Sequence, residues 1–141
     1  MTDLSCFKEY DIRGEIGVNI DEGVAYSIGR AVAQHFSAKS IVIGFDARKT
    51  SLPFSIAAAR GVTDAGADVF SIGMTGTEEM YWAVTEFRAC AGIEITASHN
   101  PINYNGLKIV KAESNPLDEK KDFQQIKKMA EDQIWYTKKE K

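Results

Sequence analysis

The sequence predicts an α/β fold, a three-layer α/β/α domain with a mixed, mostly parallel sheet and helices on both faces. Segments rich in β-branched residues alternate with segments whose apolar residues recur at helical spacing. Such alternation implies βαβ crossovers and therefore parallel strands covered by helices. With 141 residues, of which 44% are hydrophobic, the chain has enough apolar material for one domain.

The first elements are an extended stretch and an amphipathic helix. The extended stretch ends at Gly14, and Asp21 introduces apolar residues at helical spacing as far as His35. We expect His35, at the end of this helix, to be a capping or surface histidine. Residues 40–46 form a short β-branched run, which is typical of a strand covered on both faces.

The strand and helix pattern then repeats along the chain. We expect Ser51 to cap the next helix and Gly66 to end it. Residues 67–72 are the next predicted strand, Thr77 is the expected cap of the helix after it, and residues 92–96 form another strand.

The last predicted elements are a strand at residues 107–110 and a charged helical segment. Pro116 precedes that segment, in which Phe123, Ile126 and Ala130 have helical spacing.

Composition restricts the class of partner. The chain has 17 Lys and Arg against 20 Asp and Glu, a net charge of −3, and this balance does not favour nucleic acid or an anionic membrane surface. The two cysteines lack metal-ligand spacing, and the N-terminal residues lack the basic start and apolar run of a secretory signal. We therefore expect a cytoplasmic protein that binds a small soluble ligand.

Three polar clusters follow predicted strands, at residues 46–51, 73–78 and 98–108. In open α/β sheets, ligands bind beyond the carboxyl ends of the strands. Function is therefore expected where these clusters meet. For Asp46 and Arg48 in the first cluster, a role near the reactive loop and a structural pairing at a strand end are both open.

The third cluster carries the most chemistry. A hydroxyl, Ser98, stands beside the imidazole of His99, which suggests a nucleophile or phosphate carrier, and Lys108 adds a cation. Asn100 and the pair Asn105–Gly106 offer turn chemistry. The alternative is that Ser98 and Asn100 cap a turn, His99 is exposed and Lys108 lies on the solvent face of a strand. Residue types alone leave both interpretations open.

Residues 96–101, Thr-Ala-Ser-His-Asn-Pro, with the Asn-Gly and Lys at 105–108, resemble the active-site serine loop of the α-D-phosphohexomutases. The resemblance extends to residues 7–14 and 44–51 and covers the chain to about residue 110. Residues 73–81 are similar to the bacterial phosphomannomutases of GDP-mannose and surface-polysaccharide synthesis.

This resemblance implies a phosphomannomutase that interconverts mannose 6-phosphate and mannose 1-phosphate. Ser98 would be phosphorylated, donate its phosphoryl group to a hexose monophosphate, and recover one from a hexose 1,6-bisphosphate intermediate. Phosphoryl transfer needs cations around the transferred oxygens. The resemblance casts His99 and Lys108 as acid/base or charge-stabilising groups. It casts Tyr10 and Arg13 as residues that line the phosphate pocket, and Asn100 as a support of the serine loop.

The resemblance also implies Mg²⁺, with a phosphate oxygen on Ser98 as one ligand and carboxylates as the others. In relatives those carboxylates come from an aspartate-rich loop of the second domain, and no Asp-x-Asp-x-Asp pattern occurs in this chain. We therefore expect residues 1–141 to be domain I of the enzyme, with domains II to IV absent and the isolated domain inactive. The expected partners are hexose phosphates and the remaining domains.

Two alternatives remain open from sequence. One is a phosphoglucomutase or a dual-specificity phosphohexomutase, because the loop that reads the sugar belongs to a later domain. A different class is a non-catalytic phosphosugar-binding module, which the missing metal ligands motivate.

Overall fold

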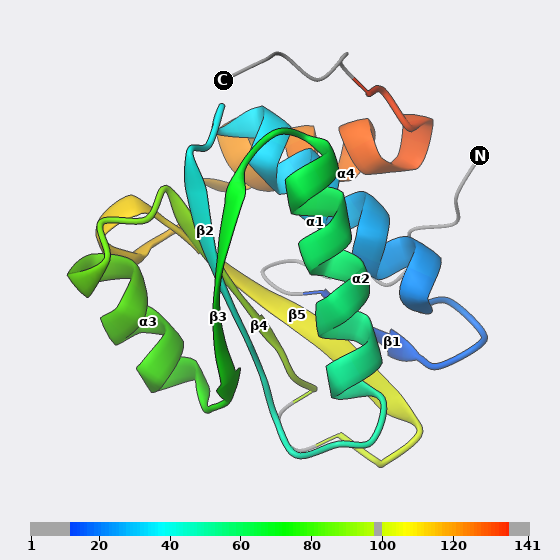
Figure 1. The fold of residues 1–141 in the computed structure, drawn as a ribbon. Coiled ribbons are helices and arrows are strands. Elements are labelled where there is room, and N and C mark those ends of the chain that lie inside the picture. Colours follow the sequence, from blue (N-terminus) through cyan, green and yellow to red (C-terminus); the bar gives the residue numbers. More distant parts are fainter. Residues whose placement is uncertain (1–11, 98–99, 136–141) are drawn as a thin grey trace.

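The computed structural model describes residues 12–97 and 100–135 and confirms the three-layer α/β/α architecture (Figure 1). The described strands are β1 (Ile12–Glu15), β2 (Ser40–Phe45), β3 (Asp68–Met74), β4 (Ala91–Ile95), β5 (Tyr104–Lys111) and β6 (Asn115–Pro116). The described helices are α1 (Glu22–His35), α2 (Ser51–Asp64), α3 (Thr77–Glu86) and α4 (Gln124–Asp132), the last preceded by one π-helical turn.

The sheet has the order β1-β5-β4-β2-β3. The short strand β6 pairs with the last residues of β5, whereas β1 pairs with its first residues. β2 is parallel to both β3 and β4, whereas β5 is antiparallel to β4, β1 and β6. Among the described strands, β5 therefore runs opposite to the other five, and the expectation of a mixed, mostly parallel sheet is confirmed. The reversal follows from the connection: residues 96–103 are too few for a helical crossover, which needs a dozen or more.

Helices cover both faces of this sheet, as Figure 1 shows. α1, α2 and α4 lie on one face, where they bury the larger core, and α3 lies on the other. Alternate residues of each strand serve the two layers. The side chains that face α1, α2 and α4 include Ile41, Ile43, Ile93, Ile95 and Leu107. Those that pack with α3 include Val42 and Val110.

Two glycines bring the backbones of α1 and α2 close together. A Cβ atom on Gly29 would lie 2.3 Å from the carbonyl oxygen of Ala58, and one on Gly61 would lie 2.2 Å from that of Tyr26. Any side chain at either position would push the helices apart, so the layer beside the larger core depends on both glycines.

The predictions that Ser51 and Thr77 are N-caps are wrong by one residue. Each residue is the first of its helix, and the N-cap positions are Thr50 and Gly76. The hydroxyl of Ser51 belongs to a long-range polar network described below, so it is not available to cap α2. At α3, the carboxylate of Glu79 accepts a hydrogen bond from the Gly76 amide at 2.9 Å and supplies the cap.

The other element predictions are confirmed with small changes in extent. The Asp21 side chain accepts a hydrogen bond from the Val24 amide and caps α1. Gly66, with a φ of 96°, follows the end of α2. Phe123 and Ile126 are buried, as their helical spacing predicts. Within the described residues, no helix has both the length and the apolar character that crossing a membrane requires.

His35 is half-buried and pairs with a side chain, which corrects the expectation of a capping or surface histidine, since the C-cap of α1 is Phe36. Its Nε2 lies 2.9 Å from Oδ1 of Asp122, and the Lys111 ammonium group lies 3.0 Å from Oδ2 of the same carboxylate. The backbone amide of Asp118 also donates to Oδ2, at 2.8 Å. The buried carboxylate of Asp122 thereby joins α1, β5 and the turn before α4.

These contacts make Asp122 a stabilising carboxylate. Burial alone would raise the pKa of Asp122, but the hydrogen bonds from His35, the Asp118 amide and Lys111, together with the charge of Lys111, hold it below its usual value. A carboxyl group with a lowered folded-state pKa contributes stability above its unfolded-state pKa, and that contribution is lost as the pH falls through the folded-state value.

We predict that Asp122→Asn lowers the free energy of unfolding at pH 7 by about 2 kcal/mol, because it removes a charged acceptor from three donors. The difference from the unsubstituted chain should begin to shrink below about pH 4, where the unfolded-state carboxyl becomes protonated, and should vanish only as the pH falls through the lower folded-state pKa. Urea unfolding at pH 7 and pH 3.5 measures both. The matched control is Asp132→Asn, which removes an exposed ion pair with Lys128 at 3.8 Å and should change stability by less than about 0.5 kcal/mol. Equal effects of the two variants would contradict this role of Asp122.

Candidate active site

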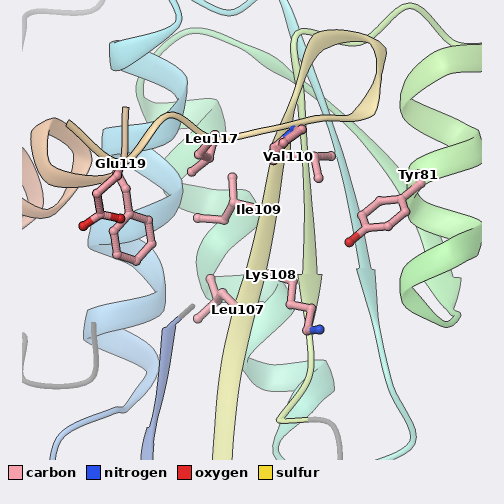
Figure 2. Close-up of a pocket in the computed structure, with 9 residues that line it drawn as sticks. Tyr81, Leu107, Lys108, Ile109, Val110, Leu117 and Glu119 are labelled. Atoms are coloured by element: carbon pink, nitrogen blue, oxygen red, sulfur yellow. The ribbon is translucent and has the colours of Figure 1, made fainter. Parts of the chain in front are cut away.

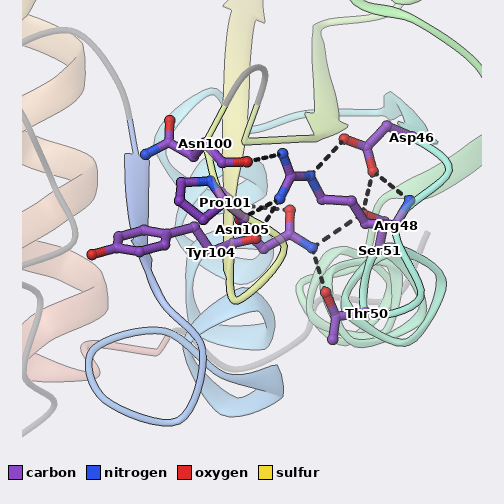
Figure 3. A network of polar contacts seen from close by, with 9 residues as sticks. Asp46, Arg48, Thr50, Ser51, Asn100, Pro101, Tyr104 and Asn105 are labelled. Carbon is purple, nitrogen blue, oxygen red and sulfur yellow. Dashed lines mark hydrogen bonds and ion pairs between the residues drawn. The ribbon is translucent and has the colours of Figure 1, made fainter.

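Arg48 anchors the segment that follows positions 98–99 (Figure 3). Its guanidinium group donates hydrogen bonds to the carbonyl oxygens of Asn100 at 2.6 Å, Pro101 at 2.7 Å and Tyr104 at 3.1 Å. One side chain from the loop after β2 therefore holds the loop after β4 at three points.

The carboxylate of Asp46 orients Arg48. Asp46 Oδ2 lies 3.6 Å from Nε of Arg48, and Asp46 Oδ1 accepts hydrogen bonds from the Arg48 amide at 3.0 Å and from the Ser51 hydroxyl at 2.5 Å. Arg48 thus approaches the serine loop and also pairs with Asp46, so the two interpretations left open by the sequence are both part of one arrangement.

Asn105 extends the network into the sheet. Its buried amide donates to the hydroxyls of Thr50 at 2.8 Å and Ser51 at 3.0 Å, and its Oδ1 accepts from the Gly106 amide at 2.8 Å. The turn chemistry expected of Asn105 and Gly106 is wrong, because β5 begins at Tyr104 and both residues lie inside it. Gly106 instead allows β1 to approach, since a Cβ atom there would lie 2.1 Å from the carbonyl oxygen of Ile12.

The opposite face of β5 carries the cations. Arg13 pairs in register with Gly106, and Lys108 is two residues farther along β5, so Arg13 and Lys108 lie on one face of neighbouring strands. Lys108 is half-buried and lines a hollow of about 290 Å³ together with Tyr81 and Val110 (Figure 2). The Thr96 amide donates to the Gly106 carbonyl at 2.9 Å and fixes this end of β5 beside the reactive segment.

Three of the residues predicted from sequence, Tyr10, Ser98 and His99, lie outside the described residues. The structure does describe Asn100, whose amide donates to the Ala97 carbonyl at 3.0 Å and whose carbonyl accepts from Arg48. The chain on both sides of positions 98 and 99 is therefore held in place. The chemical roles of these residues remain predictions.

Glu94 is fully buried in β4 and contacts the side chain of Thr75. It pairs in register with Gly44 of β2 on one side and Lys108 of β5 on the other. Glu94 Oε1 accepts a hydrogen bond from the Thr75 hydroxyl at 3.1 Å, whereas Oε2 has no hydrogen-bond partner within the described part of the chain. Within the described residues, the Thr75 hydroxyl is thus the hydrogen-bond partner of this buried carboxylate.

Burial raises the pKa of Glu94 to about 7. The hydrogen bond from Thr75 opposes this rise, and the negative charges of Asp46 and Glu79 add to it. One hydrogen bond is too little to offset the removal of the carboxylate from water.

Sequence reasoning missed the hydroxyls of Thr50 and Thr75 and the backbone carbonyls of Pro101 and Tyr104. Backbone acceptors carry no sequence signal. For the two threonines, the available signal was their position in the polar clusters that connect strands to the following helices at the carboxyl edge.

No group of three or more His, Cys, Asp or Glu side chains in residues 12–97 and 100–135 is arranged to hold a metal ion. Two carboxylates near the reactive segment are already engaged, Asp46 by Arg48 and Ser51, and Glu94 by Thr75. The described residues therefore do not fit a complete Mg²⁺ site.

We predict that Arg48→Lys lowers the free energy of unfolding by about 2 kcal/mol, because a single ammonium group cannot reach three carbonyls that a planar guanidinium group spans. Thermal or urea unfolding of the chain measures this. Lys49→Arg, at an exposed neighbouring position, is the matched control and should be near neutral. An Arg48→Lys variant as stable as its control would show that the three contacts do not anchor the loop.

We predict that Glu94→Gln becomes progressively more stable, relative to the unsubstituted chain, as the pH rises from 5 to 8. A carboxyl group whose pKa is higher in the folded than in the unfolded state loses folding free energy as it ionises between the two values. With values of about 7 and 4.5, this loss is about 3 kcal/mol at pH 8. Urea unfolding across that range measures it, and a stability difference independent of pH would contradict the raised pKa.

Comparisons with known proteins place this arrangement in a family. The family model described as phosphoglucomutase/phosphomannomutase, alpha/beta/alpha domain I, matches residues 5–136. A phosphomannomutase of Klebsiella pneumoniae is 48% identical over 132 residues, which cover 94% of this chain and 84% of that protein. A phosphomannomutase of Escherichia coli is also 48% identical over 132 residues, but this chain spans only 29% of its length.

A solved structure gives the same result. The phosphoglucomutase/phosphomannomutase family protein of Burkholderia thailandensis superposes with a TM-score of 0.86 at 33% identity, over 98% of this chain and 32% of that one. The chain therefore belongs to the phosphoglucomutase/phosphomannomutase family and has the fold of its α/β/α domain I.

Proposed function

We propose that this chain is the phosphoserine-bearing domain of a phosphomannomutase, which interconverts mannose 6-phosphate and mannose 1-phosphate. Relatives with that name match more than nine-tenths of the chain at 45–48% identity. Ser98 is the proposed carrier of the phosphoryl group, and a hexose 1,6-bisphosphate is the proposed intermediate.

The observation that carries this proposal is the anchoring of the chain on both sides of position 98. β4 leads into it from the sheet, and Arg48 fixes the carbonyls of Asn100, Pro101 and Tyr104 after it. A group that gives up a phosphoryl group and takes it back must keep one position in both transfers, and rigid support of this kind favours catalysis.

The positive charge of Arg13 and Lys108, on one face of β1 and β5, suits the proposed chemistry. A phosphoserine carries a charge of about −1.5 to −2 near neutral pH. Arg13 and Lys108 bring two cations to neighbouring strands at this edge. These cations favour binding of phosphate and stabilise the negative charge that develops on its oxygens during transfer.

The proposed reaction consists of two transfers. In the first, the bond between phosphorus and Ser98 Oγ breaks, a bond forms to a hydroxyl oxygen of the hexose monophosphate, and the hydroxyl proton leaves to a base as Ser98 Oγ regains one. The second transfer reverses these steps with the phosphoryl group at the other end of the bisphosphate. His99 and Lys108 are the proposed acid/base or charge-stabilising groups, Tyr10 and Arg13 line the phosphate pocket, and Asn100 supports the loop.

The proposal includes parts that this chain does not supply. Carboxylate ligands of Mg²⁺, apart from a phosphate oxygen on Ser98, and the groups that read the sugar are assigned to domains II to IV of a longer enzyme in the cytoplasm. The isolated domain would then show negligible turnover. This division agrees with the E. coli relative, of which the chain spans 29%.

We predict that the complete enzyme, incubated with mannose 1,6-bisphosphate and Mg²⁺, gains one phosphate that maps to Ser98, because the reaction needs a covalent carrier. Intact and peptide mass spectrometry measures it, and addition of mannose 6-phosphate should remove the label. Ser98→Ala should stay unlabelled, while the control Ser71→Ala, at an exposed position on β3, should label normally.

Two other outcomes would contradict the proposal, one its catalytic role and the other its preference for mannose. An enzyme that remains unlabelled although folded and bound to hexose phosphate would be a phosphosugar-binding module. A labelled enzyme that turns over glucose phosphates faster than mannose phosphates would be a phosphoglucomutase.

A further inference from the structure

Glu94 lowers the stability of the fold at its position. It is fully buried on the face of β4 that packs against α3. Its neighbour on that face, Gly92, lies against Val84 and Met80, so the surrounding layer is apolar. An apolar side chain would suit this layer better, because a buried carboxylate with an unpartnered oxygen costs folding free energy.

The surroundings of Glu94 are nevertheless built around its carboxylate. A Cβ atom on Gly44, its register partner in β2, would lie 2.6 Å from Glu94 Oε1 and 2.3 Å from the Thr75 hydroxyl oxygen. Glycine at position 44 therefore makes the space in which Thr75 and Glu94 meet. The Thr75 amide also donates to the Phe45 carbonyl at 2.8 Å, which fixes the loop between β3 and α3 against β2.

The other register partner of Glu94 is Lys108, one of the two cations on this face. Side chains directly opposite each other on antiparallel strands have Cβ atoms about 5 Å apart. Within residues 12–97 and 100–135, no hydrogen bond or ion pair joins the Lys108 ammonium group to another residue. The Lys108 side chain thus starts across the strand pair from a buried carboxylate whose Oε2 has no hydrogen-bond partner within the described residues, and no ion pair joins the two groups in this structure.

We propose that Glu94 is a positioning residue for phosphoryl transfer: its carboxylate fixes Lys108 across the strand pair and, through Thr75, the loop after β3, next to the segment that leads to Ser98. This inference rests on the proposed function. A lysine side chain has four rotatable bonds, so a fixed counter-charge beside it narrows the positions of its ammonium group. A narrower distribution keeps the cation near the transferred phosphoryl oxygens.

Within the described residues, the charges that act on Glu94 are those of Asp46 beyond β2 and Glu79 on α3, Lys108 on β5 is its register partner, and β3 leads to the hydroxyl of Thr75. Because burial raises the pKa of Glu94 to about 7, the carboxylate forms as the pH rises through neutrality. Turnover that depends on this carboxylate should rise over the same range.

The test compares Glu94→Gln with the matched control Glu86→Gln, an exposed carboxylate at the end of α3, in the complete enzyme. We expect Glu94→Gln to lower kcat at pH 8 about tenfold or more, with KM for mannose 1-phosphate changed less than about threefold. Its unfolding midpoint at pH 8 should not fall, because the substitution removes a buried charge. The rise of kcat through neutral pH should be absent in this variant and intact in the control.

A double-mutant cycle with Lys108→Met shows whether Glu94 acts through Lys108. If it does, Glu94→Gln has little further effect on kcat in the Lys108→Met background. A Glu94→Gln effect of the same size in both backgrounds, or a loss of kcat that follows a loss of stability, would overturn the proposal. So would a Glu94→Gln enzyme with unchanged kcat. These results differ from failure of the proposed function, in which the unsubstituted enzyme itself takes up no phosphate on Ser98 and the inference falls with it.

Discussion

The hydrogen bonds of Arg48 are the constraint on which the candidate site depends. They join two loops that are 52 residues apart in sequence, between Arg48 and Asn100. Backbone carbonyls of a loop, and of the residue that starts a strand, need water or another donor where no neighbouring strand supplies one. One guanidinium group satisfies three of them and so defines the path of the reactive segment without contributing a reactive atom.

The alternation of side chains along β5 places the anchoring hydrogen bonds on one face of the sheet and the cations on the other. Asn105 faces the layer of α1 and α2, where it binds the hydroxyls at the start of α2. Lys108 faces the other layer, on the same side as Arg13 and Glu94. Because successive residues of a strand point to opposite faces, one strand serves the anchoring network and the proposed phosphate pocket at once. A shift in register by one residue would exchange the two faces, and the contacts of Gly106 with β1 oppose such a shift.

Periodicity and turn residues predicted the order of helices and strands, the two covered faces and the place of the site. The errors have a common physical cause, which is contact between residues distant in sequence. Ser51 does not cap α2 because Asp46 and Asn105 engage its hydroxyl, and His35 is not a surface residue because Asp122 approaches it from 87 positions away. The reversed direction of β5 depends on the length of the preceding loop, which residue types alone do not fix.

Asp122 and Glu94 show how the same chemical group takes opposite roles in one domain. Both are buried carboxylates. Asp122 receives hydrogen bonds from two side chains and a backbone amide, and its pKa is lowered, whereas Glu94 receives one and its pKa is raised. The hydrogen bonds and the Lys111 charge outweigh the effect of burial on the pKa of Asp122, whereas the single hydrogen bond from Thr75 does not outweigh it at Glu94. Asp122 lies at the end of β5 remote from the reactive loop, where stability is what a charge can contribute. Glu94 lies beside Lys108 and four residues before Ser98, where a destabilising charge is tolerable if it orders the groups around a phosphate.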